Sequence, residues 1–170
     1  AAQRPVKVTL QRPLMFNNTT HRPATIQRIR IGAARDGKIT AIGHESCSGN
    51  LPDGDPETAV NQTKYLYAGQ NRLTAMKLAR LDLPEGNAMR APGEAPGLAV
   101  LEVAMDELAH ALDLDPIELR VRNEPPEDPE TGNPWSSRRL LDCLREGARR
   151  FGWERRVAEP AARRNGRQLV

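Results

Sequence analysis

One arginine stands on a tightly specified stretch of backbone, NAMRAPGEAPG, at residues 87–97. Pro92 fixes its own φ and disfavours helical geometry at Ala91, and Gly93 permits backbone angles and close approaches that other residues resist. A helical pattern begins a few residues later, so backbone N–H groups and a helix N-terminus face one region beside Arg90. This arrangement predicts a pocket or a site for an anionic group. The alternative is a plain loop-to-helix junction with a solvated arginine, which is a common way into a helix.

The other residue types that carry chemistry are scattered along the chain. His21, His44 and His110 fall on separate predicted elements, and neither a C-x-x-C nor an H-E-x-x-H pattern is present, so we expect no self-contained metal site. No G-x-S-x-G turn offers a serine nucleophile. Cys47 and Cys143 are too few for a disulfide framework in a chain of 170 residues, and two free thiols are favoured over one long-range bridge.

The elements before the loop read as strands and turns. Alternation of apolar and polar residues, with many β-branched ones, predicts a strand at 5–11 and a β-hairpin with arms at 26–31 and 39–42 around an Asp-Gly turn. Residues 49–63 combine turn residues with little apolar content and predict a surface loop. The runs KYLYA and MKLARLDLP are short strands or extended passages that lead to the arginine loop.

The elements after the loop read as helices. Helical spacing predicts a first helix whose buried side carries Leu98, Leu101, Val103, Met105, Leu108 and Leu112. Asp115 as N-cap and Pro116 at the first helical position begin a second helix. After a proline-rich connector, a third helix is capped by Ser136 or Ser137 and ends near Gly152. Strands followed by helices predict an α+β fold.

Composition places few limits on function. Apolar residues make up 38% of the sequence, which is enough for a core, and the net charge of +3 identifies no partner. No apolar run has the length of a membrane span, and the first residues lack the layout of a signal peptide. Because the chain starts and ends inside apparent strands, we expect it to be an internal piece of a longer protein.

Five stretches, in order along the chain, resemble the molybdenum-binding large subunit of the xanthine dehydrogenase and aldehyde oxidase family. They are RPVKVTLQR, HRPATIQRIRIGAARDGKITAIGHE, YAGQNR, MRAPGEAPGLAVLEVAMDELAHALDLDPIELRVRNEP and PWSSRRLLDCLREGARRFGW. The sequence is most similar to the bacterial aldehyde oxidoreductase branch, which has MRAPGE where xanthine dehydrogenases have Arg-Gly-Phe-Gly-Gly. The long MRAPGE stretch with the helix after it is the specific part of the resemblance.

The resemblance implies a molybdenum hydroxylase, which oxidises aldehydes or aromatic heterocycles with water as the oxygen source. Its cofactors would be molybdenum-molybdopterin, in the cytosine dinucleotide form, and iron–sulfur clusters and FAD on partner subunits. Its partners would be the remainder of the large subunit, those two subunits and a small-molecule substrate, with no nucleic acid and no membrane span. The enzyme would be cytoplasmic, or periplasmic by export of the folded complex.

In the family, the arginine of this loop lies against the molybdenum centre. Carried over, the catalytic role falls on Arg90, and cofactor contact falls on Met89, Arg90 and Ala91. Pro92 stands where xanthine dehydrogenases stack their substrate on a phenylalanine, and their second substrate arginine has no counterpart before Tyr67, so a purine substrate is disfavoured. The family's catalytic glutamate and glycine-rich loop would lie outside this sequence, and no metal ligand is expected within it.

The resemblance also assigns parts of the chain to parts of a molybdopterin-binding domain. Residues 1–86 would be mostly strands and loops, 87–97 the cofactor-facing loop, 98–153 helices, and 154–170 a tail leading into a next strand. We expect the chain alone to be inactive. We also expect Glu94 to be a helix N-terminal residue rather than the catalytic base, and His21 to be structural.

The alternative to a molybdenum hydroxylase is a stand-alone basic binding or scaffold module that engages an acidic partner through its C-terminal arginines.

Overall fold

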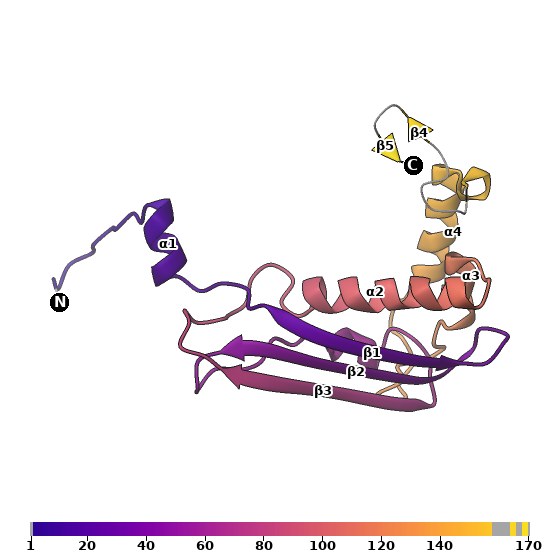
Figure 1. The fold of residues 1–170 in the computed structure, drawn as a ribbon, viewed down its shortest axis with the longest axis horizontal. Helices are drawn as coiled ribbons and strands as arrows, with labels where there is room; N and C mark the ends of the chain where they lie inside the picture. The colour runs from indigo at the N-terminus through magenta and orange to yellow at the C-terminus, as the bar shows by residue number, and fades with distance from the viewer. Residues whose placement is uncertain (1, 158–163, 166–167, 170) are drawn as a thin grey trace. The chain divides into compact units, whose positions relative to one another are not determined.

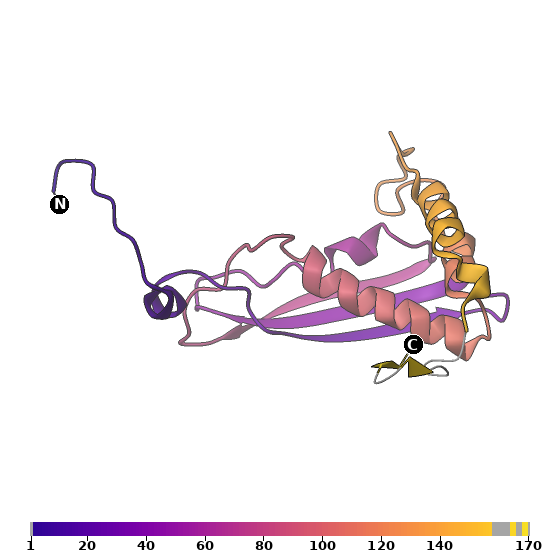
Figure 2. The same cartoon turned by 90° about the horizontal axis from the view of Figure 1, so that it is seen from above.

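The computed structural model describes residues 2–157, 164–165 and 168–169, and the chain divides into two compact units, Ala1–Pro134 and Trp135–Val170. In the first unit, a three-stranded sheet carries helices on one face (Figures 1 and 2). Its elements are α1 (Arg12–Asn18), β1 (Thr25–Ala33), β2 (Ile39–Asn50), the 3-10 turn η1 (Asn61–Lys64), β3 (Asn71–Arg80), α2 (Glu94–Ala111) and α3 (Pro116–Arg122). The predicted α+β fold is confirmed.

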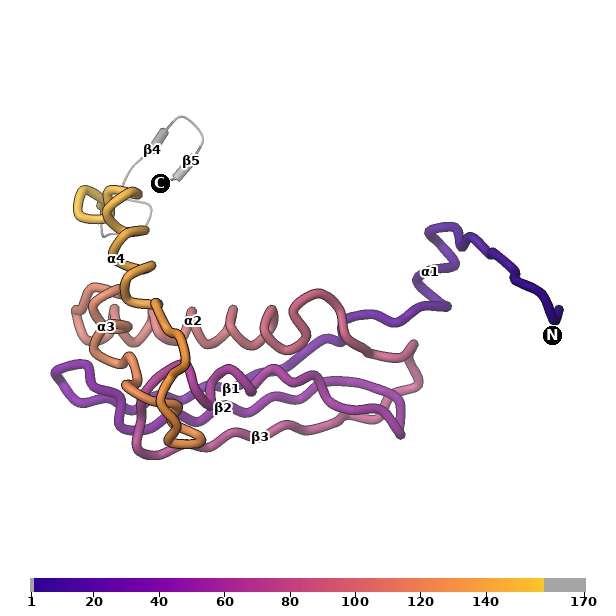
Figure 3. Tube along the Cα trace, turned by 180° about the vertical axis from the view of Figure 1, so that it is seen from behind, coloured from indigo at the N-terminus to yellow at the C-terminus, as the bar shows by residue number. Residues whose placement is uncertain are grey.

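The sheet has β2 at its centre. β1 and β2 are antiparallel, and the predicted Asp-Gly turn joins them with Gly37 at φ 85°, so the hairpin is confirmed. β3 pairs with β2 in parallel, with Asn50 opposite Arg80 at their carboxyl ends. A parallel pair needs a crossover, and residues 51–70, which include η1, supply it. Figure 3 shows β1, β2 and β3 side by side from behind.

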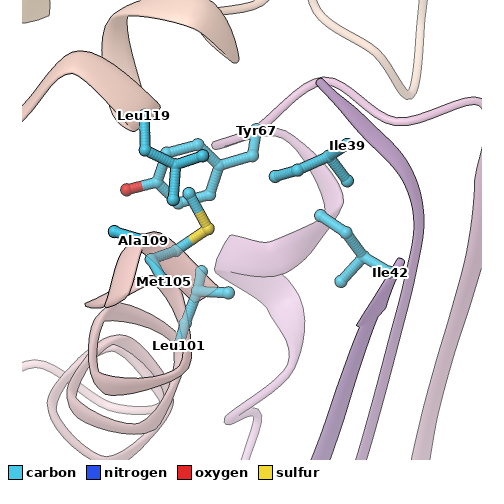
Figure 4. Packing of buried hydrophobic residues seen from close by; sticks show 7 residues of the cluster. All are labelled: Ile39, Ile42, Tyr67, Leu101, Met105, Ala109 and Leu119. Atoms are coloured by element: carbon cyan, nitrogen blue, oxygen red, sulfur yellow. The ribbon is translucent and has the colours of Figure 1, made fainter. Parts of the chain in front are cut away.

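The core lies between β2, α2 and α3. Alternate residues of β2 face α2, because side chains alternate between the two faces of a strand. In Figure 4, Met105 of α2 lies beside Tyr67, Leu101 lies next to Met105, and both face Ile42 across the core. The buried apolar cluster is made of Ile39, Ile42, Tyr67, Leu101, Met105, Ala109 and Leu119. One continuous cluster therefore fixes α2 over the sheet.

Two predictions about the first part of the chain are wrong. Residues 5–11 form no strand: they are exposed, they pair with no described strand, and α1 follows them directly. An alternating pattern forms a strand only where a neighbouring strand accepts its hydrogen bonds. Residues 49–63 are not a surface loop, because β2 continues to Asn50 and the later part is buried, including Ala59 and Val60. This part is buried because the first turn of α2 packs against it.

The first two predicted helices are both found. α2 begins at Glu94, the predicted N-terminal residue, so its first turn overlaps the segment 87–97 that was assigned to the loop. Val103 is exposed because the helical period places Leu101, Met105 and Leu108 on the other side. α3 is capped as predicted, since the Asp115 carboxylate accepts hydrogen bonds from the backbone N–H groups of the next turn.

Two further segments were predicted as short strands or extended passages. KYLYA is mostly turn, whereas MKLARLDLP supplies the end of β3.

The second unit contains α4 (Leu140–Phe151), the 3-10 turn η2 (Trp153–Arg155), β4 (Arg164–Asn165) and β5 (Gln168–Leu169). The predicted serine cap is wrong, because α4 begins after Arg139 with no side-chain cap, whereas the predicted end at Gly152 is confirmed by its left-handed φ of 76°. Most of the predicted C-terminal tail lies outside the described residues. Among the described residues, no helix combines the length and apolar character needed to cross a membrane.

Candidate functional site

The arginine loop runs from residue 87 to residue 93, because Glu94–Gly97, which were predicted as loop, already form the first turn of α2. Pro96 is tolerated there because the first turn leaves its backbone N–H groups unpaired in any helix. Ala91 has φ 59° and Gly93 has φ 77°. A left-handed conformation costs a residue with a Cβ about 1 to 2 kcal/mol. The shape at Ala91 therefore depends on contacts from outside the loop.

Arg22 and Glu57 supply those contacts. The Arg22 guanidinium donates to the carbonyl oxygens of both Arg90 and Ala91, at 3.1 Å for Ala91. The same guanidinium lies 3.5 Å from Oε1 of Glu57, and that oxygen accepts a hydrogen bond from the backbone N–H of Gly93 at 2.6 Å. Glu57 is buried and Arg22 is half-buried. One ion pair thus holds both ends of the strained stretch.

Asn50, at the end of β2, ties the beginning of the loop to the sheet. Its side-chain amide exchanges two hydrogen bonds of 2.9 Å with the backbone of Gly86. The backbone of His21 bonds to Glu85 at 3.2 Å and to Asn87 at 3.0 Å. His21 is therefore structural through its backbone, while its imidazole is exposed. These contacts bring residues 20–22, 50–57 and 85–93 together.

The start of α2 is seated on the buried part of the crossover. A Cβ added at Gly97 would lie 1.8 Å from the carbonyl oxygen of Ala59, so helix and crossover touch backbone to backbone. Gln62 donates to the Glu94 carboxylate at 3.1 Å. Glu94 is the first residue of the helix, as predicted, and its carboxylate suits the positive end of the helix dipole.

The three predicted site residues, Met89, Arg90 and Ala91, are exposed on this loop. No hydrogen bond or ion pair joins the Arg90 guanidinium to any residue that the structure describes. The peptide between Arg90 and Ala91 is trans, so its N–H points away from its carbonyl and from Arg22. A cationic side chain and a backbone donor are thus both left available on this short stretch.

A cleft of about 290 Å³ lies on another side of the loop. Ala88 and Pro92 line it, whereas Met89, Arg90 and Ala91 do not. Its acidic lining residues are Asp53, Asp55, Glu57 and Glu85. Carboxylates repel an anion, so this cleft disfavours a phosphate group, and the side of the loop that carries Arg90 is the better place for one.

The three histidines do not come together. His44 is buried in β2, bonded to Thr63 at 2.7 Å and to Gln27 at 2.9 Å, and burial lowers its pKa. His21 and His110 are exposed. Within the described part of the chain, no three or more His, Cys, Asp or Glu side chains are placed to hold a metal ion. Cys47 and Cys143 are free thiols, as predicted.

Arg22, Glu57 and Asn50 were not predicted as site residues. Arg22 lies in the HRP motif, but nothing in its spacing connects it with carbonyls 68 and 69 residues later. Glu57 stood in a segment that the sequence indicated to be a surface loop. Alternate residues of β2 are polar and buried, namely His44, Ser46, Ser48 and Asn50. Their burial cannot be recognised before the sheet register is known.

Comparison with known proteins identifies relatives of the whole chain. The chain is 60% identical along its whole length to the aldehyde oxidoreductase molybdenum-binding subunit PaoC of Escherichia coli (strain K12), and it spans 23% of that protein. Over 91% of its length it is 32% identical to the putative xanthine dehydrogenase molybdenum-binding subunit XdhA of the same strain, of which it spans 22%. The chain thus covers about a quarter of the length of these relatives.

Solved structures share the fold. Quinoline 2-oxidoreductase from Pseudomonas putida 86 superposes on 85% of the chain with a TM-score of 0.76 at 18% identity, over 20% of its own length. The aldehyde oxidoreductase from Desulfovibrio desulfuricans ATCC 27774 superposes on 86% with a TM-score of 0.68 at 25% identity, over 18% of its length. Residues 1–124, which include the arginine loop, Arg22 and Glu57, match the molybdopterin cofactor-binding domain. The chain therefore belongs to the family of molybdopterin cofactor-binding domains.

Proposed function

We propose that this chain forms one wall of the molybdenum cofactor site in the large subunit of a molybdenum hydroxylase that oxidises aldehydes with oxygen from water. The observation that carries the proposal is the arginine loop: its backbone is held on one side by Arg22 and Glu57, and the guanidinium of Arg90 has no partner among the described residues. The 60% identity with an aldehyde oxidoreductase molybdenum-binding subunit supports this reaction class.

The residues present fit an anionic cofactor. A molybdopterin carries phosphate, and the Arg90 guanidinium and the Ala91 N–H both favour negative charge. When bound, the cofactor would supply the redox chemistry. Met89, Arg90 and Ala91 would contact it, and Arg90 would stabilise negative charge that develops during the reaction. Because the loop conformation is fixed beforehand, little reorganisation is needed when that charge appears.

The substrate we propose is a small neutral aldehyde or aromatic heterocycle. Pro92 follows directly on the loop residues proposed to contact the cofactor, and it offers neither an aromatic ring nor a cation for a purine. The rest of the large subunit and separate iron–sulfur and FAD subunits would complete the enzyme, with the cofactor in its cytosine dinucleotide form and the assembly in the cytoplasm or exported folded to the periplasm.

The alternative of a basic scaffold module gains no support. Of the C-terminal arginines that the structure describes, Arg149 and Arg150 both pair with Glu146, at 2.8 and 2.6 Å. Their charge is thus partly neutralised within α4. None of the relatives compared above is a scaffold protein by its name.

Substitution of Arg90 in the complete subunit tests the proposal. Arg90→Ala should lower aldehyde turnover by roughly a hundredfold to a thousandfold, because the loss of one preorganised charge donor costs about 2.7 to 4 kcal/mol in the transition state. Arg90→Lys should recover part of the rate, since a point charge does not reproduce a planar fork. Steady-state kinetics, with molybdenum content measured for each variant, gives the comparison.

The matched control is Arg35→Ala, which removes an exposed arginine from the β1–β2 turn. It should leave turnover unchanged. Wild-type turnover in Arg90→Ala at full molybdenum occupancy would contradict the proposal and leave Arg90 as a solvated residue at a helix entry.

A further inference from the structure

We propose that Arg22 and Glu57 are positioning residues: together they form a clamp that sets the direction of the peptide between Arg90 and Ala91 and so presents the arginine loop to its ligand. This inference rests on the proposed function for the identity of that ligand. The clamp itself is defined by three contacts: Arg22 to the carbonyls of Arg90 and Ala91, Arg22 to Glu57, and Gly93 N–H to Glu57.

The first step is the direction of the peptide groups. Arg22 donates to two consecutive carbonyls, so both point toward the same guanidinium. Since a trans peptide directs its N–H opposite to its carbonyl, the N–H of Ala91 must point away from the clamp. Pro92 has no N–H, so Ala91 carries the one donor of these two peptides. The clamp thereby decides where that donor is offered.

The second step is the strain that the clamp opposes. Ala91 precedes a proline, and a residue before proline prefers an extended backbone with a strongly negative φ. In the structure it has φ 59° instead. If the guanidinium were removed, the backbone would relax toward the extended region and turn the peptide before Ala91. The N–H would then leave its position even if the sheet and α2 stayed in place.

The third step is the burial of Glu57. Its side chain is 7% exposed, and one oxygen serves both Arg22 and Gly93. An exposed ion pair contributes little to a structure, whereas the loss of one partner of a buried pair leaves an uncompensated charge. If Arg22 moved into solvent, the buried Glu57 carboxylate would therefore be left without its partner. This coupling makes the pair a clamp rather than a surface contact.

The test uses Arg22→Gln, Arg22→Lys and Glu57→Gln in the complete subunit. We expect Arg22→Gln to raise amide hydrogen exchange in a peptide covering residues 87–97 and to lower molybdenum retention or kcat/KM by about tenfold to a hundredfold, the range typical of residues that orient metal ligands. The Mo(V) electron paramagnetic resonance signal should shift as well. Arg22→Lys should recover part of the loss, because an ammonium does not reproduce the guanidinium fork. Glu57→Gln should resemble Arg22→Gln.

The control is Arg30→Gln, which removes the same charge from β1, where Arg30 makes an exposed ion pair with Glu45 at 3.7 Å. It should change none of these measurements. Unchanged exchange at residues 87–97 in Arg22→Gln would overturn the clamp. Faster exchange there with molybdenum content, Mo(V) signal and kinetics all unchanged would overturn the positioning role. A wild-type subunit that binds no molybdenum would instead refute the proposed function, and the exchange comparison would still decide whether the clamp exists.

Discussion

His44 is neutral in the folded chain, and its hydrogen bonds decide which ring nitrogen carries the proton. Gln27 donates through its amide nitrogen to the carbonyl of Pro96 at 3.2 Å, so its oxygen must face His44 Nε2. Nε2 therefore carries the hydrogen, and Nδ1 accepts the hydroxyl hydrogen of Thr63. Burial lowers the pKa of His44 below its ordinary 6.5, which agrees with this neutral form.

This assignment predicts a loss of stability in acid. Below pH 6.5 the unfolded chain binds a proton at residue 44 that the folded chain does not, so the free energy of unfolding should fall as the pH decreases from 6.5 toward the lowered pKa. Denaturant unfolding at a series of pH values should show a shallower slope in His44→Gln than in the wild type. His110→Gln, at an exposed position of α2, is the matched control. Nitrogen-15 shifts that show an Nδ1–H tautomer would contradict the assignment.

At the same scale, part of the site could be predicted from the sequence. The proline and glycine around Arg90 mark a specified loop without any tertiary information. Arg22 and Glu57 could not be connected with it, because a hydrogen bond between residues 68 apart leaves no local pattern. The buried polar residues of β2 likewise cannot be interpreted before the crossover is placed, because Thr63 bonds to His44 and the backbone of Glu57 bonds to Ser48.

The element on which the site depends most is α2, whose first turn touches the crossover backbone to backbone. Helical periodicity and caps predicted α2 and α3, because those signals are local. The strand predicted at 5–11 does not form, because a strand needs a neighbouring strand to pair with and its own residues do not specify one. The loop assigned to 87–97 ends earlier than expected, because Gly93 takes the N-cap position of α2 without a side-chain cap that the sequence could show.

We expect Gly97→Ala to destabilise the fold. Its Cβ would meet the carbonyl oxygen of Ala59 at 1.8 Å, so the helix start must shift, and overpacking of this kind costs roughly 1 to 3 kcal/mol. Gly147→Ala is the matched control, because it places the same methyl in α4 with nothing within 4 Å. An alanine there should be neutral or stabilising by up to about 1 kcal/mol. Equal unfolding midpoints for the two variants would show that the close contact at Ala59 relaxes without cost.

For the whole molecule, the class of fold could be predicted from the sequence, but the pairing of the strands could not. Strands followed by helices indicated α+β, but the parallel addition of β3 beside β2 depends on a crossover that looked like an exposed loop. The many turn residues of the crossover indicated an exposed segment, although Ala59 and Val60 within it are fully or nearly fully buried. Composition alone does not show which side of a polar segment will be covered.

We expect the 170-residue chain, purified alone and supplied with cofactor, to oxidise no aldehyde. It spans 23% of the aldehyde oxidoreductase subunit that it resembles, and in the proposed function its arginine loop would form only one wall of the site. The measurement is aldehyde oxidation with an artificial electron acceptor, with the complete subunit as the positive control. Turnover by the chain above that of heat-denatured chain would contradict this expectation.

The mixed pairing of the sheet has a consequence for the order of folding. β1 and β2 are close in sequence and meet through a short turn, whereas β3 joins in parallel after a long crossover, a slower kind of pairing. Arg22 lies just before β1, and the arginine loop follows β3. We therefore expect the hairpin to form early and the contact between Arg22 and the loop to close among the last steps. Binding of the proposed cofactor at this loop would then show that the first unit has finished folding.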